Sequence, residues 1–187
     1  MAFLTAKQLQ EMGFASLGRN VKISDKASIY NAEQMEIGDL SRIDDYCVLS
    51  GRINIGRNVH IAAQSLISGG RAGVVLEDFT GLAYGAKVIA QSDDYSGTTM
   101  TNPTVPLALK QEIEASVTLG RHTILGAGAI VLPGVVIGEG CAVGAGSVVL
   151  KNTPAWSILA GVPAKFVRHR EQGLLAYEQT YLNQNET

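Results

Sequence analysis

VTLGRHTILGAGAIVLPGVVIGEGCAVGAGSVV, residues 117–149, repeats its pattern every six positions. Each sixth residue is a large aliphatic one, and the residue two places earlier is small or β-branched, as Thr123 is before Leu125. A helix would instead space its apolar residues three and four apart. Spacing of two within a period of six predicts short strands joined by tight corners, the pattern of hexapeptide repeats in a parallel β-helix.

The same period runs through the N-terminal half. After a shift of three residues beyond Ile67, the spacing resumes at Leu76. Glycine often follows the aliphatic residue, as at Gly56 and Gly126, and we interpret it as supplying the backbone angles of the corners. Stacked coils would bury the aliphatic columns, so the predicted fold class is all-β. The aliphatic positions are Ile37, Ile43, Leu49, Ile55, Ile61, Ile67, Leu76, Leu82, Val88, Leu119, Leu125, Val131, Ile137, Val143 and Val149.

Length and composition indicate one domain. The 187 residues are 46% hydrophobic and 17% charged, which excludes a disordered chain. A net charge of −2 argues against a nucleic-acid binder. Two distant cysteines, Cys47 and Cys141, form no disulfide framework and are predicted to be small buried hydrophobes. The N-terminus does not resemble a signal peptide and no apolar run could span a bilayer, so we expect a soluble cytoplasmic protein.

Three segments are predicted along the chain. Residues 1–16 form a helical segment, because Thr5–Gln8 has the form of a capping box. Residues 17–166 form the β-helix, which a loop at about residues 91–116 interrupts. This loop is rich in Asp, Asn, Gly and Pro, and a long excursion of this kind is expected to carry function. Residues 167–187 form a tail, with an amphipathic helix expected from Val167 to about Leu182.

The C-terminal repeats resemble a known family. Leu132–Gly138, Val143–Val149 and above all the ending Ala160–Lys165, AGVPAK, are similar to the acetyl-CoA half of bacterial sugar O-acetyltransferases with hexapeptide repeats. The resemblance covers about residues 17–170. It implies a left-handed β-helix, a homotrimer with sites between subunits, and acetyl-CoA as co-substrate.

The resemblance also implies where the coenzyme lies. In similar enzymes the pantetheine arm follows the late coils, and basic residues meet the phosphates. The alternative is that the glycines and alanines serve only the corners and that the basic residues are solvated surface charges. The implied coenzyme-binding residues are Gly126, Ala127, Gly144, Ala145, Lys151, Lys165 and Arg168.

The catalytic base is where this sequence departs from the family. Similar O-acetyltransferases carry a catalytic histidine at the start of the protruding loop, but this chain has Asp93 there and no histidine in residues 91–116. His60 is predicted to point outward, because its neighbours Val59 and Ile61 point inward. It could pair with Asp93 or Asp94 across the coils or across a subunit interface. The catalytic candidates are therefore His60, Asp93 and Asp94, against the alternatives of a surface histidine and turn-forming aspartates.

The remaining polar candidates are weaker. His122 is expected to face solvent or a neighbour from a corner, and His169 to be a phosphate-binding or surface residue in a basic tail. Tyr95 could stack on a sugar or a nucleotide base. The candidate acceptor-binding residues are Arg71, Tyr84, Tyr95 and Asn102.

The leading functional hypothesis is O-acetylation of a saccharide in surface-polysaccharide or lipopolysaccharide synthesis. The alternative is N-acetylation of a nucleotide-linked amino sugar, because a neutral amine needs no strong base. Relatives of that type have Asn-Asp in the loop, and Asp93-Asp94 is closer to that pair. A remote alternative is a γ-class carbonic anhydrase, which shares the solenoid but needs three histidine ligands for zinc. No histidine pairing on one coil supports it, and no metal site is predicted.

Overall fold

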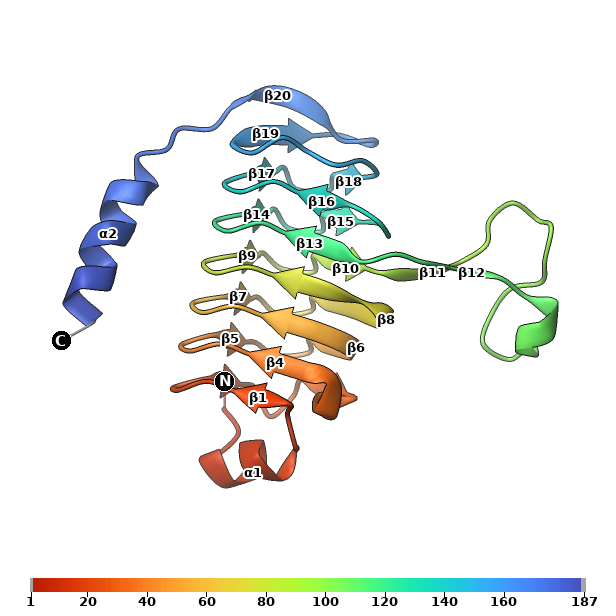
Figure 1. Cartoon of the computed structure of the whole chain (residues 1–187), viewed down its shortest axis with the longest axis horizontal. Coiled ribbons are helices and arrows are strands. Elements are labelled where there is room, and N and C mark those ends of the chain that lie inside the picture. Colours follow the sequence, from red (N-terminus) through yellow and green to blue (C-terminus); the bar gives the residue numbers. More distant parts are fainter. Residues whose placement is uncertain (1, 186–187) are drawn as a thin grey trace.

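The computed structural model describes residues 2–185, most of which wind into a left-handed parallel β-helix (Figure 1). Each coil crosses three flat faces and turns at three corners. Within the described residues, the faces are built from one ten-stranded and one eight-stranded sheet. The fold class predicted from the hexapeptides is confirmed.

The first and second faces share the ten-stranded sheet, which bends over the corner between them. β6 (Val48–Ile55) and β8 (Leu66–Leu76) cross both faces, since the start of β6 pairs with β3 and its end with β4. The first face also holds β3 (Ser28–Tyr30), β10 (Lys87–Ile89), β15 (Ile130–Val131) and β18 (Val148–Val149). The second face also holds β1 (Ser16–Leu17), β4 (Met35–Ile37), β13 (Val117–Leu119) and β16 (Val136–Ile137).

The third face is the eight-stranded sheet. Its strands are parallel except the last, which pairs antiparallel with its neighbour. The strands are β2 (Lys22–Ile23), β5 (Arg42–Ile43), β7 (His60–Ile61), β9 (Gly81–Leu82), β14 (Ile124–Leu125), β17 (Ala142–Val143), β19 (Ser157–Ala160) and β20 (Lys165–His169).

Three corners separate these faces, and each is named here by what it carries. The Ala127 corner joins the eight-stranded face to the first face. The arm corner joins the first face to the second and carries the protruding loop. The helix corner joins the second face to the eight-stranded face and lies beside the C-terminal helix α2 (Leu174–Asn185).

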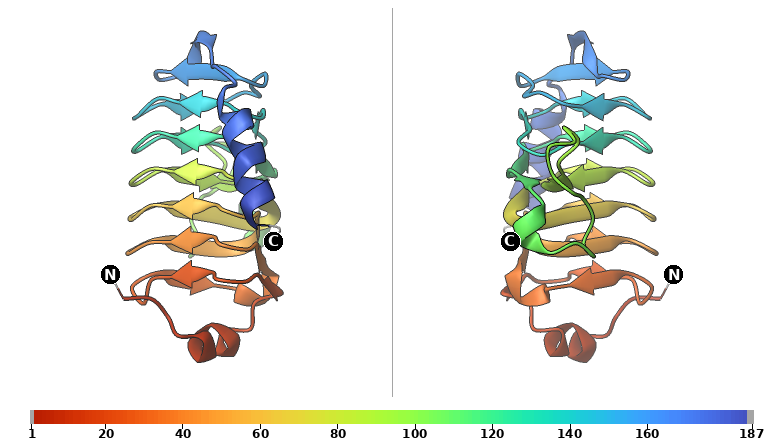
Figure 2. Two further views of the ribbon diagram at one scale, coloured as in Figure 1. Left: turned by 90° about the vertical axis from the view of Figure 1, so that its left-hand side faces the viewer. Right: turned by 90° about the vertical axis from the view of Figure 1, so that its right-hand side faces the viewer.

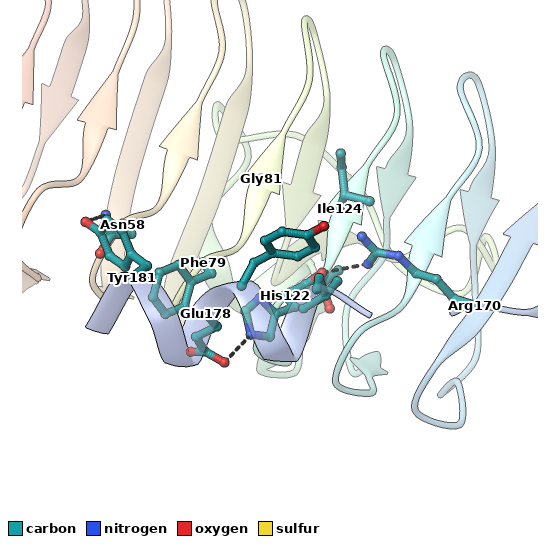
Figure 3. Close-up of a pocket in the computed structure, with 11 residues that line it drawn as sticks. Asn58, Phe79, Gly81, His122, Ile124, Arg170, Glu178 and Tyr181 are labelled. Atoms are coloured by element: carbon teal, nitrogen blue, oxygen red, sulfur yellow. Dashed lines mark hydrogen bonds and ion pairs between the residues drawn. The ribbon is translucent and has the colours of Figure 1, made fainter. Parts of the chain in front are cut away.

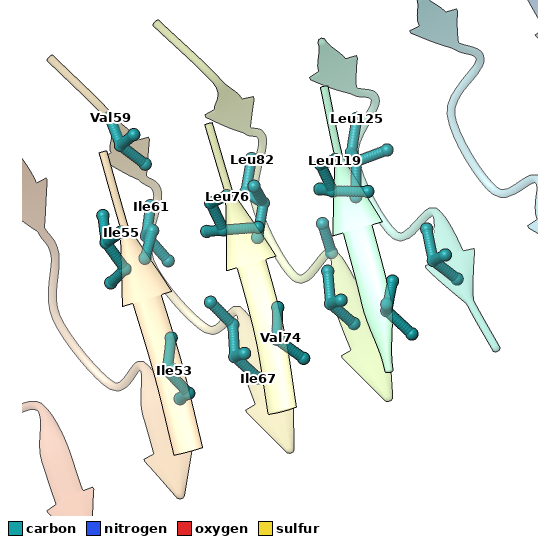
Figure 4. Packing of buried hydrophobic residues seen from close by; sticks show 14 of the residues in the cluster. Ile53, Ile55, Val59, Ile61, Ile67, Val74, Leu76, Leu82, Leu119 and Leu125 are labelled. Atoms are coloured by element: carbon teal, nitrogen blue, oxygen red, sulfur yellow. The ribbon is translucent and has the colours of Figure 1, made fainter. Parts of the chain in front are cut away.

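The predicted aliphatic columns fill the interior. All fifteen positions from Ile37 to Val149 named above are at most 3% exposed. Figure 4 shows Ile55, Leu76 and Leu119 stacked from coil to coil, with Ile61, Leu82 and Leu125 in a second column. Cys47 and Cys141 are fully buried free thiols, as predicted. Burial raises the pKa of the Cys47 thiol.

The glycines that follow the aliphatic residues do a different job from the one predicted. Gly56 and Gly126 do not have left-handed backbone angles; an added β-carbon would lie 2.4 Å from Asp78 Oδ1 and 2.5 Å from the backbone nitrogen of Ala145, respectively. Close coil-to-coil approach therefore selects glycine here. The left-handed residue comes two places later, as Asn58 (φ 55°) and Gly128 (φ 67°) show.

The predicted loop is an arm that projects from the arm corner. Its base is an antiparallel ribbon of β11 (Gln91–Asp93) and β12 (Glu112–Glu114), and the 3₁₀ turn η2 (Leu107–Leu109) lies near its tip. The boundaries agree with the predicted residues 91–116. A second short 3₁₀ turn, η1 (Ala32–Gln34), leads into β4 on an early coil.

The two ends differ in how well they were predicted. At the N-terminus, α1 (Ala6–Glu11) starts with the predicted capping box, in which Thr5 and Gln8 bond each other reciprocally. The helix predicted from Val167 is wrong in its start, because Lys165–His169 form β20 and add to the edge of β19. The open edge of β19 satisfies these backbone groups, and Gly173 further disfavours an earlier helix.

Gly38→Ala tests the close coil contact. An added β-carbon would lie 2.5 Å from the carbonyl carbon of Gly56 and 2.7 Å from the nitrogen of Arg57. We expect the free energy of unfolding to fall by about 1–3 kcal/mol, measured by urea denaturation at matched protein concentration. Gly173→Ala, whose β-carbon would meet no atom within 4 Å, is the control. Equal losses in both variants would contradict the explanation.

Candidate active site

His60 lies in the middle of the eight-stranded face and points outward as predicted, with 51% of its side chain exposed. Its Nε2 lies 2.9 Å from Oδ2 of Asp44. Oδ1 of Asp44 accepts a hydrogen bond of 2.6 Å from Nε of Arg42. Only 6% of the Asp44 side chain is exposed. Its carboxylate is held between Arg42 and His60 and fixes the orientation of the imidazole ring.

This pairing determines which ring nitrogen of His60 is available. An ionised carboxylate only accepts hydrogen bonds, so Nε2 carries the proton and Nδ1 of the neutral ring is a bare acceptor. A histidine oriented in this way by a carboxylate suits general-base chemistry. Within the chain, the partner of His60 is therefore Asp44 and not Asp93 or Asp94, because the adjacent coil supplies a carboxylate directly.

A hollow of about 220 Å³ opens beside His60. Gly81 on β9 and Ile124 on β14 line it from the next two coils, and Tyr84 closes it at the Ala127 corner. The Tyr84 ring is available to a ligand, since the residue is 68% exposed. The structure thus brings together two predicted site residues, His60 and Tyr84, which lie on successive coils and line the same hollow.

The Ala127 corner continues from this hollow along the solenoid axis. The Tyr84 carbonyl accepts a 2.9 Å hydrogen bond from the N–H of Gly128, and the Ala127 carbonyl accepts one of 2.8 Å from the N–H of Gly146. Tyr84, Ala127 and Ala145 therefore occupy the same corner position on successive coils. The predicted coenzyme-binding alanines form one column that ends at the hollow.

The other predicted coenzyme residues are placed in two groups. Coil packing accounts for Gly126, as shown above, and tightly constrains Gly144, whose added β-carbon would lie 3.2 Å from that of Ala160. Lys165 and Arg168 are exposed on β20, at the C-terminal end of the eight-stranded face. Lys151 instead lies at the arm corner, between β18 and the bridge that Thr153 makes to the second face.

The side chains of Asp93 and Asp94 accept hydrogen bonds from other residues of the arm. Oδ1 of Asp93 accepts a 3.1 Å hydrogen bond from the N–H of Asn102. Asp94 accepts bonds from both the N–H (2.9 Å) and the hydroxyl (2.7 Å) of Ser96. Hydrogen bonds from the Ser96 hydroxyl and backbone hold the pKa of Asp94 below its usual value. A carboxylate stabilised in this way is a weaker base.

The arm lies on the side of the solenoid away from α2 (Figure 2). The arm corner does not border the eight-stranded face, so one chain does not place Asp93, Asp94 or Asn102 beside His60. Tyr95 is 87% exposed on the arm. Arg71 lies on β8 at the base of the arm, where its Nε donates at 3.0 Å to the carboxylate of Glu114.

His122 lies at the helix corner, and of the two predicted surroundings, solvent or a neighbour, it has the second, because it faces α2. It is only 9% exposed because α2 covers it, and its Nε2 lies 2.9 Å from Oε2 of Glu178 (Figure 3). Its ring also stacks on Phe79, with centroids 5.1 Å apart. Arg121 pairs with the same Glu178 carboxylate. Burial lowers the pKa of His122.

Helix α2 stands off the solenoid enough to leave a cavity. The cavity measures about 490 Å³ and is lined by Phe79 and His122 on one side and by Tyr177 on the helix. Farther along α2, the hydroxyl of Tyr181 accepts a 2.9 Å hydrogen bond from Nδ2 of Asn58. These contacts fix the helix beside the eight-stranded face.

The three histidines are held in separate surroundings. His169 lies on β20 and contacts the ring of Phe166 edge-on, with centroids 5.0 Å apart. In residues 2–185, no group of three or more His, Cys, Asp or Glu side chains is arranged to hold a metal ion. In the same part of the chain, no helix is long and apolar enough to cross a membrane.

Asp44 is the functional candidate that sequence reasoning missed. In the hexapeptide register it occupies the position of Ala62 and Gly126, where other coils carry a small residue. A carboxylate at a position that the register buries was the available signal, because buried charges are normally paired. Gly81 and Glu178 were also missed. Gly81 can be recognised only once its neighbours in space are known, and Glu178 only once the course of α2 is known.

Comparison with known proteins shows the class of this protein. A family model described as "Bacterial transferase hexapeptide (six repeats)" matches residues 116–151. A curated acyltransferase is 42% identical to the chain over 184 residues. The chain therefore belongs to the hexapeptide-repeat acyltransferase family.

Individual relatives have more specific descriptions than the family model. The curated enzyme is dTDP-4-amino-4,6-dideoxy-D-glucose acyltransferase of Escherichia coli, and the match covers 97% of this chain and 95% of that protein. The structure of AntD, an N-acyltransferase from Bacillus cereus, in complex with dTDP and 3-hydroxybutyryl-CoA has a TM-score of 0.96 and 40% identity, covering 99% and 98% of the two chains. WbbJ of Escherichia coli (strain K12), named as a candidate lipopolysaccharide biosynthesis O-acetyl transferase, is 29% identical over 150 residues, 78% of this chain and 74% of that protein.

The His60–Asp44 pair makes a spectroscopic prediction. In wild-type protein labelled with ¹⁵N-histidine, we expect neutral His60 to be the tautomer with the proton on Nε2, because Asp44 accepts that bond. Asp44→Asn should remove this preference, since a carboxamide can donate or accept. Two-bond ¹H–¹⁵N NMR correlations identify the protonated nitrogen. A wild-type ring protonated on Nδ1 would refute the assignment.

Proposed function

We propose that this chain transfers an acyl group from a coenzyme A thioester to the amino group of a dTDP-linked amino sugar. The likeness to dTDP-4-amino-4,6-dideoxy-D-glucose acyltransferase over nearly the whole chain carries the proposal. The bound dTDP and 3-hydroxybutyryl-CoA of AntD support the same two substrates. This is the amine alternative of the sequence analysis, and it replaces O-acetylation as the leading hypothesis.

The hollow beside His60 supplies the chemistry for this transfer. The amine lone pair attacks the thioester carbonyl carbon, the carbon–sulfur bond breaks, and its electron pair leaves with sulfur. The amine proton passes to Nδ1 of His60 and then to the coenzyme thiolate, so the products are an amide and free coenzyme A. Asp44 positions the ring and stabilises the imidazolium that forms.

The Ala127 corner is the proposed path of the coenzyme. The backbone at Ala127 and Ala145, next to Gly126 and Gly144, would bond the pantetheine amides, and the thioester would reach the level of Tyr84. Lys165 and Arg168 lie at the other end of this path, where they would meet the phosphates. Acetyl-CoA is the expected donor, and the bound donor of AntD makes 3-hydroxybutyryl-CoA the first alternative.

We propose a trimer formed through the first face. The outward residues Val48, Leu66, Ile130 and Val148 share one register there and form an apolar stripe that only Lys87 interrupts. The first face is bordered by the Ala127 corner and the arm corner. Three copies that meet through it would therefore set the arm of one copy beside the His60 hollow of the next.

This assembly would give roles to the predicted site residues that lie away from the His60 hollow within one chain. The neighbour's arm and the base of that arm would bring acceptor-binding groups to the hollow, namely Asp93, Asp94, Tyr95, Asn102 and Arg71. Lys151, at the neighbour's arm corner, would bring a cation to the coenzyme phosphates.

The choice of acceptor is the primary test. We expect coenzyme A release with dTDP-4-amino-4,6-dideoxyglucose and none above background with the matched sugar that carries a 4-hydroxyl. The reason is that a neutral amine is the stronger nucleophile and this loop lacks the histidine of the O-acetyltransferases. A thiol-trapping assay with acetyl-CoA and with 3-hydroxybutyryl-CoA measures both reactions. Turnover with the hydroxyl sugar alone would instead establish O-acylation.

A second prediction concerns the base. His60→Gln should lower kcat/KM by about 10²-fold at neutral pH, and the loss should shrink at higher pH as hydroxide takes the amine proton in place of the missing imidazole. Asp44→Asn should cause a smaller loss of the same kind, because it disturbs only the ring's orientation. Lys7→Gln, at an exposed position of α1 outside the proposed sites, is the control. Unchanged coenzyme A affinity in all three variants shows that the fold is intact, and a pH-independent loss would exclude His60 as the base.

A further inference from the structure

Gly81 is a strand glycine with no structural reason to be glycine. Apart from Gly173 in the tail, every other described glycine has a left-handed φ or an atom within 3.4 Å of an added β-carbon. A β-carbon on Gly81 would meet only Cγ1 of Ile124, at the ordinary contact distance of 3.8 Å. Glycine weakens a strand, so one that packing does not require marks a close approach by something else.

The position of Gly81 shows where that approach takes place. It lies in an outward row of the eight-stranded face, in register with His60 on one side and Ile124 on the other. Both neighbours carry outward side chains, so Gly81 is a gap in the row. The hollow beside His60 and the cavity under α2 are both lined by Gly81 and Ile124. The two spaces therefore adjoin at Gly81 and Ile124, and together they are called here the groove over Gly81.

The far end of the groove is aromatic. Tyr177 on α2 is 79% exposed and lines the cavity opposite Phe79. The volume of about 490 Å³ lies within the range of small-molecule sites, roughly 300–1,000 Å³. An aromatic wall of this kind suits a planar base, because every nucleobase has a face that stacks.

The helix that carries Tyr177 is anchored on both sides of it. Glu178 bonds His122 and pairs with Arg121, and its side chain is only 10% exposed. Tyr181 bonds Asn58 one turn farther along. Figure 3 shows these side chains directed from α2 toward the solenoid. The wall is thus held in place before any ligand binds.

We infer that the acceptor nucleotide lies in this groove, with its sugar amine beside His60, its middle over Gly81 and its base against Tyr177 of α2. The inference rests on the proposed function, because it takes a nucleotide-linked sugar as the acceptor. Helix α2 is then a wall of the substrate site, and Gly81 is a specificity-determining position. A side chain at residue 81 would block the groove without disturbing the coil.

Gly81→Val tests the floor of the groove. We expect the fold to persist, since the backbone of Gly81 is not left-handed and its β-carbon has room. The Kd for dTDP-4-amino-4,6-dideoxyglucose should rise about tenfold or more, as for an overfilled site, while the Kd for coenzyme A stays the same. Isothermal titration calorimetry measures both. Ala142→Val, in the same outward row beyond Ile124, is the control and should change neither.

Tyr177→Ala tests the aromatic wall. Loss of one stacking ring should raise the Kd for dTDP about tenfold, and Tyr177→Phe should restore it. The coenzyme A affinity should not move. A result in which Tyr177→Ala weakens coenzyme A and leaves dTDP unchanged would assign the groove to the donor and overturn the inference.

The remaining outcomes separate this inference from the proposed function. No turnover and no dTDP-sugar binding by wild-type protein would refute the proposed function itself. Wild-type turnover with unchanged dTDP-sugar affinity in both Gly81→Val and Tyr177→Ala would overturn the groove alone. Dissociation of the assembly by Gly81→Val in analytical ultracentrifugation would show that a second copy fills the groove, which also overturns it.

Discussion

Parallel backbone pairing between equivalent positions of successive coils is the constraint on which this structure depends. Because each strand bonds its counterpart one coil away, a residue is stacked on residues of the same register throughout the solenoid. The interior therefore favours aliphatic side chains that stack on aliphatic side chains of the adjacent coils. The corners favour residues small enough not to collide with the backbone of the next coil. The site inherits this order, since His60 and Gly81 are neighbours in a row and Tyr84 and Ala127 are neighbours in a column.

The sequence predicted the interior well and the corners less well. Burial follows the six-residue period, so the aliphatic columns and the arm could be located without any structure. The role of the glycines was misread, because a period shows where glycine occurs and not whether its angles or its missing β-carbon matters. Gly56 and Gly126 are glycines for lack of space. The left-handed turn falls two residues later and includes side chains as large as Phe79 and Trp156.

The candidate site was only partly accessible to sequence reasoning. His60 was identified because its neighbours Val59 and Ile61 both point inward, whereas Tyr84 was only a weaker acceptor-site candidate with no motif behind it. The partner of His60 was not identified, since Asp44 is sixteen residues away and becomes adjacent only through coil stacking. The neighbour of His122 was not identified for a related reason: nothing local indicates that α2 returns along the helix corner to cover it. Long-range contacts of this kind depend on where the chain goes after the repeat ends.

The column of Tyr84, Ala127 and Ala145 also places one side chain at each regular step along the solenoid axis. Successive coils are spaced by about 4.8 Å, and each touches only its immediate neighbours. On the proposed coenzyme path, a change of side chain at one coil of this column would shorten or lengthen the space for the acyl chain and leave the other coils untouched. Acyl-chain length can then diverge within such a family by single corner substitutions, with no change in the architecture that carries them.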